Sequence, residues 1–327
     1  MTALQNELMS TPKARRARML LLGALCILLI LPHIFSPIVL MRLMCYALFA
    51  SAFNLLFGFV GLLSFGHAAF FGGAAYVTAI VVKLWGVTPE IGILLGVAEA
   101  AALGAVFGVL AIRRKGIYFA MVTLALAQTF VFLCQEIPAT GGEDGIQGIS
   151  RGKLFGLIDL SENLSLYYLV LTVFLGGSFA AWRIVNSPFG SILKAIREDE
   201  TRVISLGYSV QRYKLVAFIM SAALAGLAGS MKVLVFQFAT ASDVSYHLSG
   251  DAIMMTLLGG PGTFLGPAAG AAVYISLQNV LATADLPGSI VTGPVFIFCI
   301  LMLKHGVVGD GHRAYVALRR AIKASRR

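Results

Sequence analysis

The sequence predicts an all-α protein that crosses a membrane about ten times, with several helices broken at glycine-rich segments. Of its 327 residues, 58% are hydrophobic and 12% are charged, which is about half the charged share of a soluble domain. Its apolar runs are long enough to cross a bilayer. This composition excludes a nucleic-acid-binding protein, despite the formal net charge of +10. The four cysteines lie in apolar stretches, which argues against a secreted disulfide scaffold.

Seven membrane spans stand out as apolar runs. The first follows a basic N-terminal tail (1–18) and is longer than the apolar core of a cleaved signal peptide. The stretch 43–82 contains no charged residue and is twice as long as one span, so Gly58, Gly61 and Gly66 offer places where the chain turns or breaks. The seven spans are 19–41, 43–61, 66–82, 91–112, 116–135, 164–182 and 215–231.

The placement of the basic residues predicts the orientation. Short loops rich in Lys and Arg stay in the cytoplasm, and most of the 25 basic residues lie in the two tails (1–18 and 304–327) and in the segments 113–115 and 183–214. The loop 136–163 contains five acidic and two basic residues, so we expect it outside.

With both tails inside, the number of spans is even. Three crossings within 233–303 give ten spans and one crossing gives eight. The polar stretch 238–251 is the weak point, because as an external loop it would give nine spans and an outside tail.

Enzyme motifs are absent from the sequence. It contains no G-x-x-x-x-G-K-[ST] loop for ATP, no H-E-x-x-H and no C-x-x-C. We therefore expect no catalytic residues, no metal site and no cofactor. The polar residues of the apolar region occur singly, at His67, Glu99, Gln128, Asp243, Asp251 and Asp285.

Two of these polar residues have alternative interpretations. Glu99 lies within a predicted span, where a carboxyl group either marks a transport pathway or is neutral and fixes helix packing. His67 lies beside the predicted break at Gly66 and is either a packing residue or part of a pathway. A proton-coupled carrier would have acidic residues in several spans, and only Glu99 is clear.

Glycine is denser in the runs 58–73 and 259–262 than helix packing requires. Broken helices whose backbone lines a cavity are typical of transporters. The two regions also resemble one another, since Leu-Leu-Phe-Gly (55–58) precedes Gly-His-Ala-Ala (66–69) and Leu-Leu-Gly-Gly (257–260) precedes Gly-Pro-Ala-Ala (266–269). A duplicated core and chance both account for this. Our candidates for the translocation pathway are Asn54, Gly58, Gly61, Ser64, Gly66, His67, Glu99, Gly259, Gly260 and Gly262.

The segment 183–214 predicts two short amphipathic helices between spans. Ser187 and Pro188 form a helix start, with Ser as the N-cap, and Gly207 suits a left-handed helix end. The three acids 198–200 interrupt the apolar face. A helix lying on headgroups would carry a mainly basic polar face, so the acids favour docking to a soluble cytoplasmic partner. The apolar face itself consists of Phe189, Ile192, Leu193 and Ile196.

The stretch 187–207 resembles the cytoplasmic coupling segment of branched-chain amino acid ABC transporter permeases of the LivM type. Further similar stretches follow in the family's order: 54–72, 140–148, and 213–229 followed by 259–267. Residues 201–204 depart from the pattern, because the family more often has small residues there. Urea and short-amide permeases share much of the pattern, so urea, short amides or other amino acids remain the alternative substrates.

The resemblance implies a type II ABC importer permease fold, with a permease domain over 19–303, in a bacterial inner membrane. It implies as partners a second, homologous permease subunit, two cytoplasmic ATPases and a periplasmic substrate-binding protein, with branched-chain amino acids as substrates. A secondary transporter working alone is the other alternative, and it would need no docking segment. The implied ATPase-coupling residues are Pro188, Phe189, Gly190, Ile192, Leu193, Ala195, Ile196, Arg197, Glu198, Asp199, Glu200 and Gly207.

Overall fold

The computed structural model describes residues 28–283 except 34, 143, 155 and 157, together with residues 293, 294 and 306. Several predicted segments therefore lie outside the described residues. They are the tail 1–18, residues 19–27 of the first predicted span, the tail 304–327 apart from residue 306, and the last predicted crossing apart from residues 293 and 294.

Helices form most of the described chain. The long helices are α3 (Pro37–Val60), α4 (His67–Lys83), α5 (Pro89–Ala111), α6 (Ile117–Glu136), α7 (Asn163–Val185) and α10 (Val210–Phe236). The shorter helices are α8 (Pro188–Glu198), α9 (Glu200–Ser205), α11 (Tyr246–Gly259) and α12 (Gly266–Thr283). Three short 3-10 turns are η1 (Leu31–His33), η2 (Pro138–Thr140) and η3 (Ala241–Asp243).

Five helices of the described part are long and apolar enough to cross a bilayer: α3, α5, α6, α7 and α10. The apolar helix α4 is shorter, with 17 residues. The predicted helical membrane protein is thus confirmed, whereas the count of ten spans is not.

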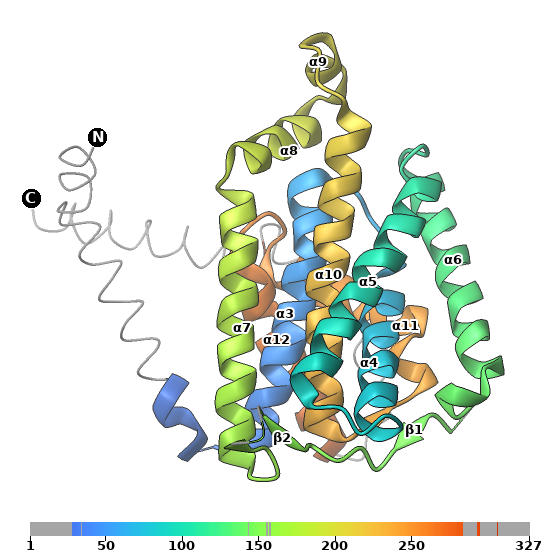
Figure 1. Cartoon of the computed structure of the whole chain (residues 1–327). Helices are drawn as coiled ribbons and strands as arrows, with labels where there is room; N and C mark the ends of the chain where they lie inside the picture. Colours follow the sequence, from blue (N-terminus) through green and yellow to red (C-terminus); the bar gives the residue numbers. More distant parts are fainter. Residues whose placement is uncertain are drawn as a thin grey trace, which may run out of the picture.

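Helices α3 and α10 form the centre of the bundle. About 78% of the apolar window of each is buried, against 28% to 33% for α5, α6 and α7. In Figure 1, α7 and α5 flank this centre and α6 lies at the outer edge, while α8 and α9 lie at one end of the bundle and the strands at the other. We call these the α8 end and the strand end.

Two helix breaks divide the apolar region as the glycine pattern predicts. Helix α3 ends at Val60, Gly61 has a left-handed φ of +81°, and α4 begins at His67. Helix α11 ends at Gly259, Gly260 has a φ of +107°, and α12 begins at Gly266. The two similar sequence stretches therefore form the same helix–break–helix pattern, with the breaks at 61–66 and 260–265.

Two expectations need correction. The predicted boundary between the first two spans, at 41–43, is wrong because α3 begins at Pro37 and continues through Arg42. Proline at the first helical position has no N–H to leave unpaired. The chain is also not purely α-helical, since the loop 136–163 contributes small antiparallel pairs. These are β1 (Ile146–Gln147) with β4 (Phe238–Ala239), and β2 (Lys153–Leu154) with β3 (Ile158–Asp159).

Candidate coupling and translocation site

The segment between α7 and α10 forms the two predicted helices. The Ser187 hydroxyl accepts a hydrogen bond from the backbone N of Gly190 at 3.2 Å, which caps the start of α8. The chain turns at Asp199, whose carboxylate accepts hydrogen bonds from the backbone N of Thr201 and Arg202 at 3.0 and 3.1 Å. Asp199 therefore ends α8 and caps α9, and Gly207 follows with a φ of +86°.

The apolar face of α8 attaches it to the bundle. Leu193 and Ile196 are buried, and the half-buried Phe189 stacks on Tyr213 of α10, with ring centroids 5.6 Å apart. A Cβ at Gly190 would lie 2.5 Å from the carbonyl oxygen of Ile184, so glycine allows α8 to approach the end of α7. Of the other predicted coupling residues, Ile192 is half-buried, and the exposed ones are Pro188, Ala195, Glu198, Asp199 and Gly207.

Glu200 differs from the two acids before it. Its carboxylate forms ion pairs with Lys115 at 3.3 Å and with Lys214 at 3.0 Å. Burial acts to raise the pKa of Glu200, but the hydrogen bonds and charges of Lys214 and Lys115 outweigh burial and lower it. Glu200 therefore ties α9 to the start of α10 and to the loop before α6, and of the three consecutive acids only Glu198 and Asp199 are exposed.

Asn54 joins α3 to the second helix break. Its side-chain amide donates a hydrogen bond to the carbonyl oxygen of Thr263 and accepts one from the backbone N of Gly262, both at 2.9 Å. One turn further along α3, a Cβ at Gly58 would overlap the Asn54 amide and lie 2.5 Å from the Gly262 N. The break therefore packs directly on α3, and glycine at position 58 is what permits this approach.

Arg197 connects α8 to both of these elements. Its guanidinium Nη1 donates a hydrogen bond to the carbonyl oxygen of Gly58 at the end of α3. A Cβ at Gly262 would lie 2.8 Å from the same Nη1 atom, and one at Gly61 would lie 3.3 Å from the Arg197 Cγ. A single side chain of α8 thus contacts the end of α3, the start of the first break and the second break.

His67 is buried at the start of α4. Its Nε2 lies 2.8 Å from the hydroxyl oxygen of Ser221 in α10, and this hydroxyl donates to the carbonyl oxygen of Ala52 at 2.5 Å. The rings of Phe53 and Phe218 pack edge-on against the imidazole, with centroids 5.1 and 6.2 Å away. These contacts favour the packing interpretation of His67.

The first break is held by hydroxyl groups. Ser64 accepts a hydrogen bond from the backbone N of Gly66 at 3.1 Å. Ser249 of α11 donates to the carbonyl oxygen of Phe65 at 2.8 Å and accepts from the backbone N of Ala68 at 2.9 Å. Ser249 thus joins the first break to α11, a role that no sequence pattern indicated.

Glu99 takes a separate position from these groups. Its carboxylate lies against Gly73 of α4, where a Cβ would come 2.7 Å from Oε1. Within the described part of the chain, its buried Oε2 has no hydrogen-bond partner. The structure thus brings together Asn54, Gly58, Gly61 and Gly262 through Arg197, while Glu99 belongs to the packing of α4 against α5. Gly259 and Gly260 form the tight end of α11, where a Cβ at Gly259 would overlap Gly266.

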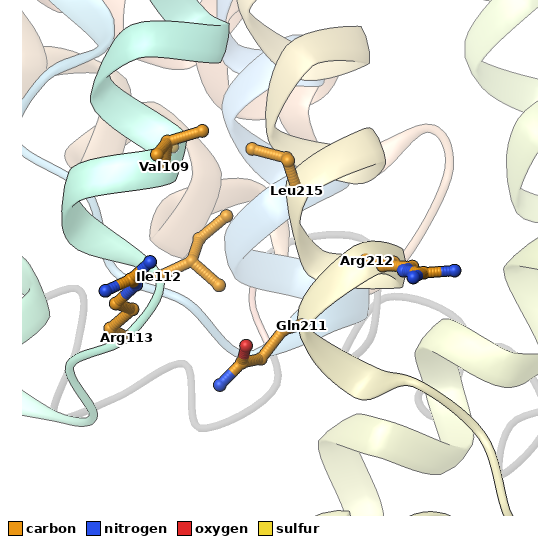
Figure 2. Close-up of a pocket in the computed structure, with 7 residues that line it drawn as sticks. Val109, Ile112, Arg113, Gln211, Arg212 and Leu215 are labelled. Atoms are coloured by element: carbon orange, nitrogen blue, oxygen red, sulfur yellow. The ribbon is translucent and has the colours of Figure 1, made fainter.

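A cavity of about 180 Å³ lies at the α8 end between α5 and α10. Figure 2 shows Val109 of α5, and Ile112 directly after its end, opposite Leu215 of α10, with Gln211 below them and Arg212 directed away. Its lining is completed by Gly108 and Arg113. Gln211 and Arg212 belong to the predicted segment 183–214, so this cavity lies beside the start of α10.

A second cavity, of about 460 Å³, lies toward the strand end. Its charged lining comes from four residues. They are Arg42 of α3, Lys232 of α10, Asp243 of η3 and Asp251 of α11. The Lys232 Nζ and the Asp243 Oδ2 form a buried ion pair at 2.6 Å. Sequence reasoning missed Arg42 and Lys232, because both fell at the edges of predicted spans.

The model of one protein family, described as "Branched-chain amino acid transport system / permease component", matches residues 37–303. The chain belongs to this family. The match extends from the start of α3 beyond α12, so it includes both helix breaks and α8–α9.

Individual permease proteins are similar to this chain over about half to four fifths of its length. The high-affinity branched-chain amino acid transport system permease protein LivM of Escherichia coli (strain K12) is 27% identical over 293 residues, which cover 81% of this chain and 68% of LivM. LivM of Salmonella typhimurium is 26% identical with the same coverage. The autoinducer 2 import system permease protein LsrC of Klebsiella pneumoniae is 28% identical over 175 residues, covering 46% of this chain and 50% of LsrC.

Proposed function

We propose that this protein is the permease subunit of an ATP-driven importer that carries leucine, isoleucine and valine. The family supports a permease component. The observation that carries the ATP-driven part is α8–α9: an amphipathic helix pair at one end of the bundle, attached by its apolar face and exposing Glu198 and Asp199. A secondary transporter that works without an ATPase needs no such element.

In the proposed topology the α8 end faces the cytoplasm of a bacterial inner membrane. The basic segments 113–115 and 183–214 lie at this end and the acidic loop 136–163 lies at the other, as short basic loops on the cytoplasmic side require. Ten spans then place both tails in the cytoplasm. The remaining partners are a second permease subunit, two cytoplasmic ATPases and a periplasmic binding protein.

Coupling follows from the contacts of α8. When the ATPases bind ATP and close, they move the exposed surface of α8–α9, and the buried face passes this movement to the bundle. Arg197 passes it to the end of α3 and to the break at 260–265, where Asn54 holds the two together. Movement of these breaks changes access to the pathway, as alternating access requires. Nucleotide shifts the equilibrium because it binds one arrangement more tightly.

Reconstitution tests this function. Proteoliposomes containing this chain, the second permease subunit and the ATPases, with the binding protein outside, should accumulate labelled leucine only when ATP is supplied to the ATPases, and a proton ionophore should not prevent it. Labelled urea should not be accumulated. Leucine uptake by this chain alone, or accumulation of urea in preference to leucine, would contradict the proposal.

Variants of the exposed acids test the docking surface. Glu198→Ala combined with Asp199→Asn removes both charges, while asparagine retains the cap of α9. We expect at least a tenfold loss of ATP-driven uptake with normal membrane insertion. Glu162→Ala, an exposed acid in the loop 136–163, is the matched control and should retain wild-type uptake.

A further inference from the structure

The cavity toward the strand end contains two charged groups that lack an ionic partner. The guanidinium of Arg42 donates hydrogen bonds to the neutral amides of Gln278 at 3.0 Å and Asn279 at 3.3 Å. The Asp251 carboxylate accepts a hydrogen bond from the Tyr274 hydroxyl at 2.5 Å. Within the described ranges, neither Arg42 nor Asp251 forms an ion pair. The other two charges of the cavity, Lys232 and Asp243, neutralise each other.

An unpaired cation and an unpaired anion in one membrane-protein cavity are costly. Their amide and hydroxyl neighbours hold both side chains in place, and the opposite charges of Arg42 and Asp251 face one cavity without a direct ion pair. Arg42 has five N–H donors in all, and its two hydrogen bonds to amides leave donors for a carboxylate, which guanidinium groups bind well. The carboxylate of Asp251 is suited to an ammonium group. The pair is therefore complementary to a zwitterion.

The remaining lining combines an apolar part, which suits an apolar side chain, with the polar residues Thr240, Ser242, Ser245 and His247. Tyr46, Phe236, Phe238 and Leu248 contribute rings and a branched alkyl group to the cavity wall. The volume of about 460 Å³ lies within the range of small-ligand sites. The cavity is formed by α3, α10, α11 and the loop 237–245, at the end of the bundle that is external in the proposed topology.

We propose that this cavity is a binding site for a free apolar amino acid, with Arg42 contacting its carboxylate and Asp251 its ammonium group. This inference rests on the proposed function and adds to it a place where the substrate is received after release from the binding protein. The Lys232–Asp243 ion pair positions the loop that closes one side of the cavity.

Ligand analogues test the site on the wild-type protein. The complete transporter, assembled without the binding protein, is titrated by saturation-transfer NMR with leucine, with leucinol, which lacks the carboxylate, and with 4-methylpentanoate, which lacks the ammonium group. Leucine should bind at least tenfold more tightly than either analogue. Binding of either analogue as tight as that of leucine, or no binding of leucine, would overturn the proposal.

Variants assign the two contacts. Arg42→Gln should lower the affinity for leucine at least tenfold and leave the affinity for leucinol within twofold of the wild type. Asp251→Asn should lower the affinity for leucine and leave the affinity for 4-methylpentanoate within twofold. Arg42→Lys should retain most of the affinity, and Lys153→Gln, an exposed change in β2, should have no effect. Equal weakening of all ligands, or none, would show that these residues do not contact substrate.

Uptake separates the two levels of the proposal. If the wild type shows ATP-driven leucine uptake but the Arg42 and Asp251 variants do not discriminate between the ligands, this site is disproved and the proposed function stands. Absence of wild-type leucine uptake removes the proposed function and the site with it.

Discussion

Arg197 is the residue through which α8 reaches both helix breaks. Its guanidinium contacts the carbonyl oxygen of Gly58 and packs beside Gly262. The family resemblance implies that Arg197 is one of the ATPase-coupling residues. Its hydrogen bond instead points into the bundle, so its proposed role is to pass on movement after docking.

Replacement of Arg197 should uncouple the transporter. Arg197→Met retains the apolar stem and removes the donor, so we expect ATP hydrolysis to continue while leucine uptake falls at least tenfold. Arg197→Lys should retain part of the uptake, because lysine is still a donor. Arg183→Met removes an exposed cation in the last turn of α7, outside α8–α9, and should behave as wild type. Equal losses of hydrolysis and uptake in Arg197→Met would instead indicate a docking contact.

A variant of Glu99 distinguishes a packing role of its carboxyl group from a role in the transport pathway. The carboxyl group lies against Gly73 and makes no ion pair among the described residues. Glu99→Gln preserves its size without its charge, so we expect uptake within about twofold of wild type. A tenfold loss of uptake with intact assembly would assign the carboxyl group to the pathway.

At the scale of elements, the contact between α3 and the break at 260–265 depends on the absence of a side chain at Gly58. Gly58→Ala would place a Cβ against the Asn54 amide and the Gly262 N. Loss of these buried hydrogen bonds costs about 1–3 kcal/mol for each unsatisfied group. We therefore expect a lower Tm of the assembled transporter and reduced uptake.

The control for this variant lies in α7. A Cβ at Gly176 has no neighbouring atom within 4 Å, so Gly176→Ala should retain the wild-type Tm. A Gly58→Ala protein as stable and active as Gly176→Ala would show that the close approach of the break to α3 is dispensable.

At the scale of the whole molecule, the proposed orientation is testable by labelling. A cysteine introduced at Asp144, in the loop 136–163, should react with an impermeant maleimide added to spheroplasts. Cysteines at Arg202 and Arg327 should react only after the membrane is opened. The native Cys45 and Cys134 are buried and should contribute little background. Labelling of Arg327→Cys from outside would support nine spans instead of ten.

Local sequence determined most of the helices, their breaks and the docking segment. The predicted spans 66–82, 91–112 and 116–135 each lie within two residues of α4, α5 and α6 at both ends, because long apolar runs and charged ends depend on neighbouring residues. The left-handed glycines at 61 and 207 were foreseeable for the same reason.

Only the tertiary structure decided where the isolated polar groups belong. The sequence predicts Arg42 at the edge of a span, whereas it lies within α3 and donates hydrogen bonds to amides 236 and 237 positions away in the chain. Arg197, Lys232 and Asp251 likewise depend on partners from other segments or on a shared cavity. A polar group in an apolar bundle is stabilised by whichever groups the fold brings within hydrogen-bond distance, and that distance is a property of the packed chain.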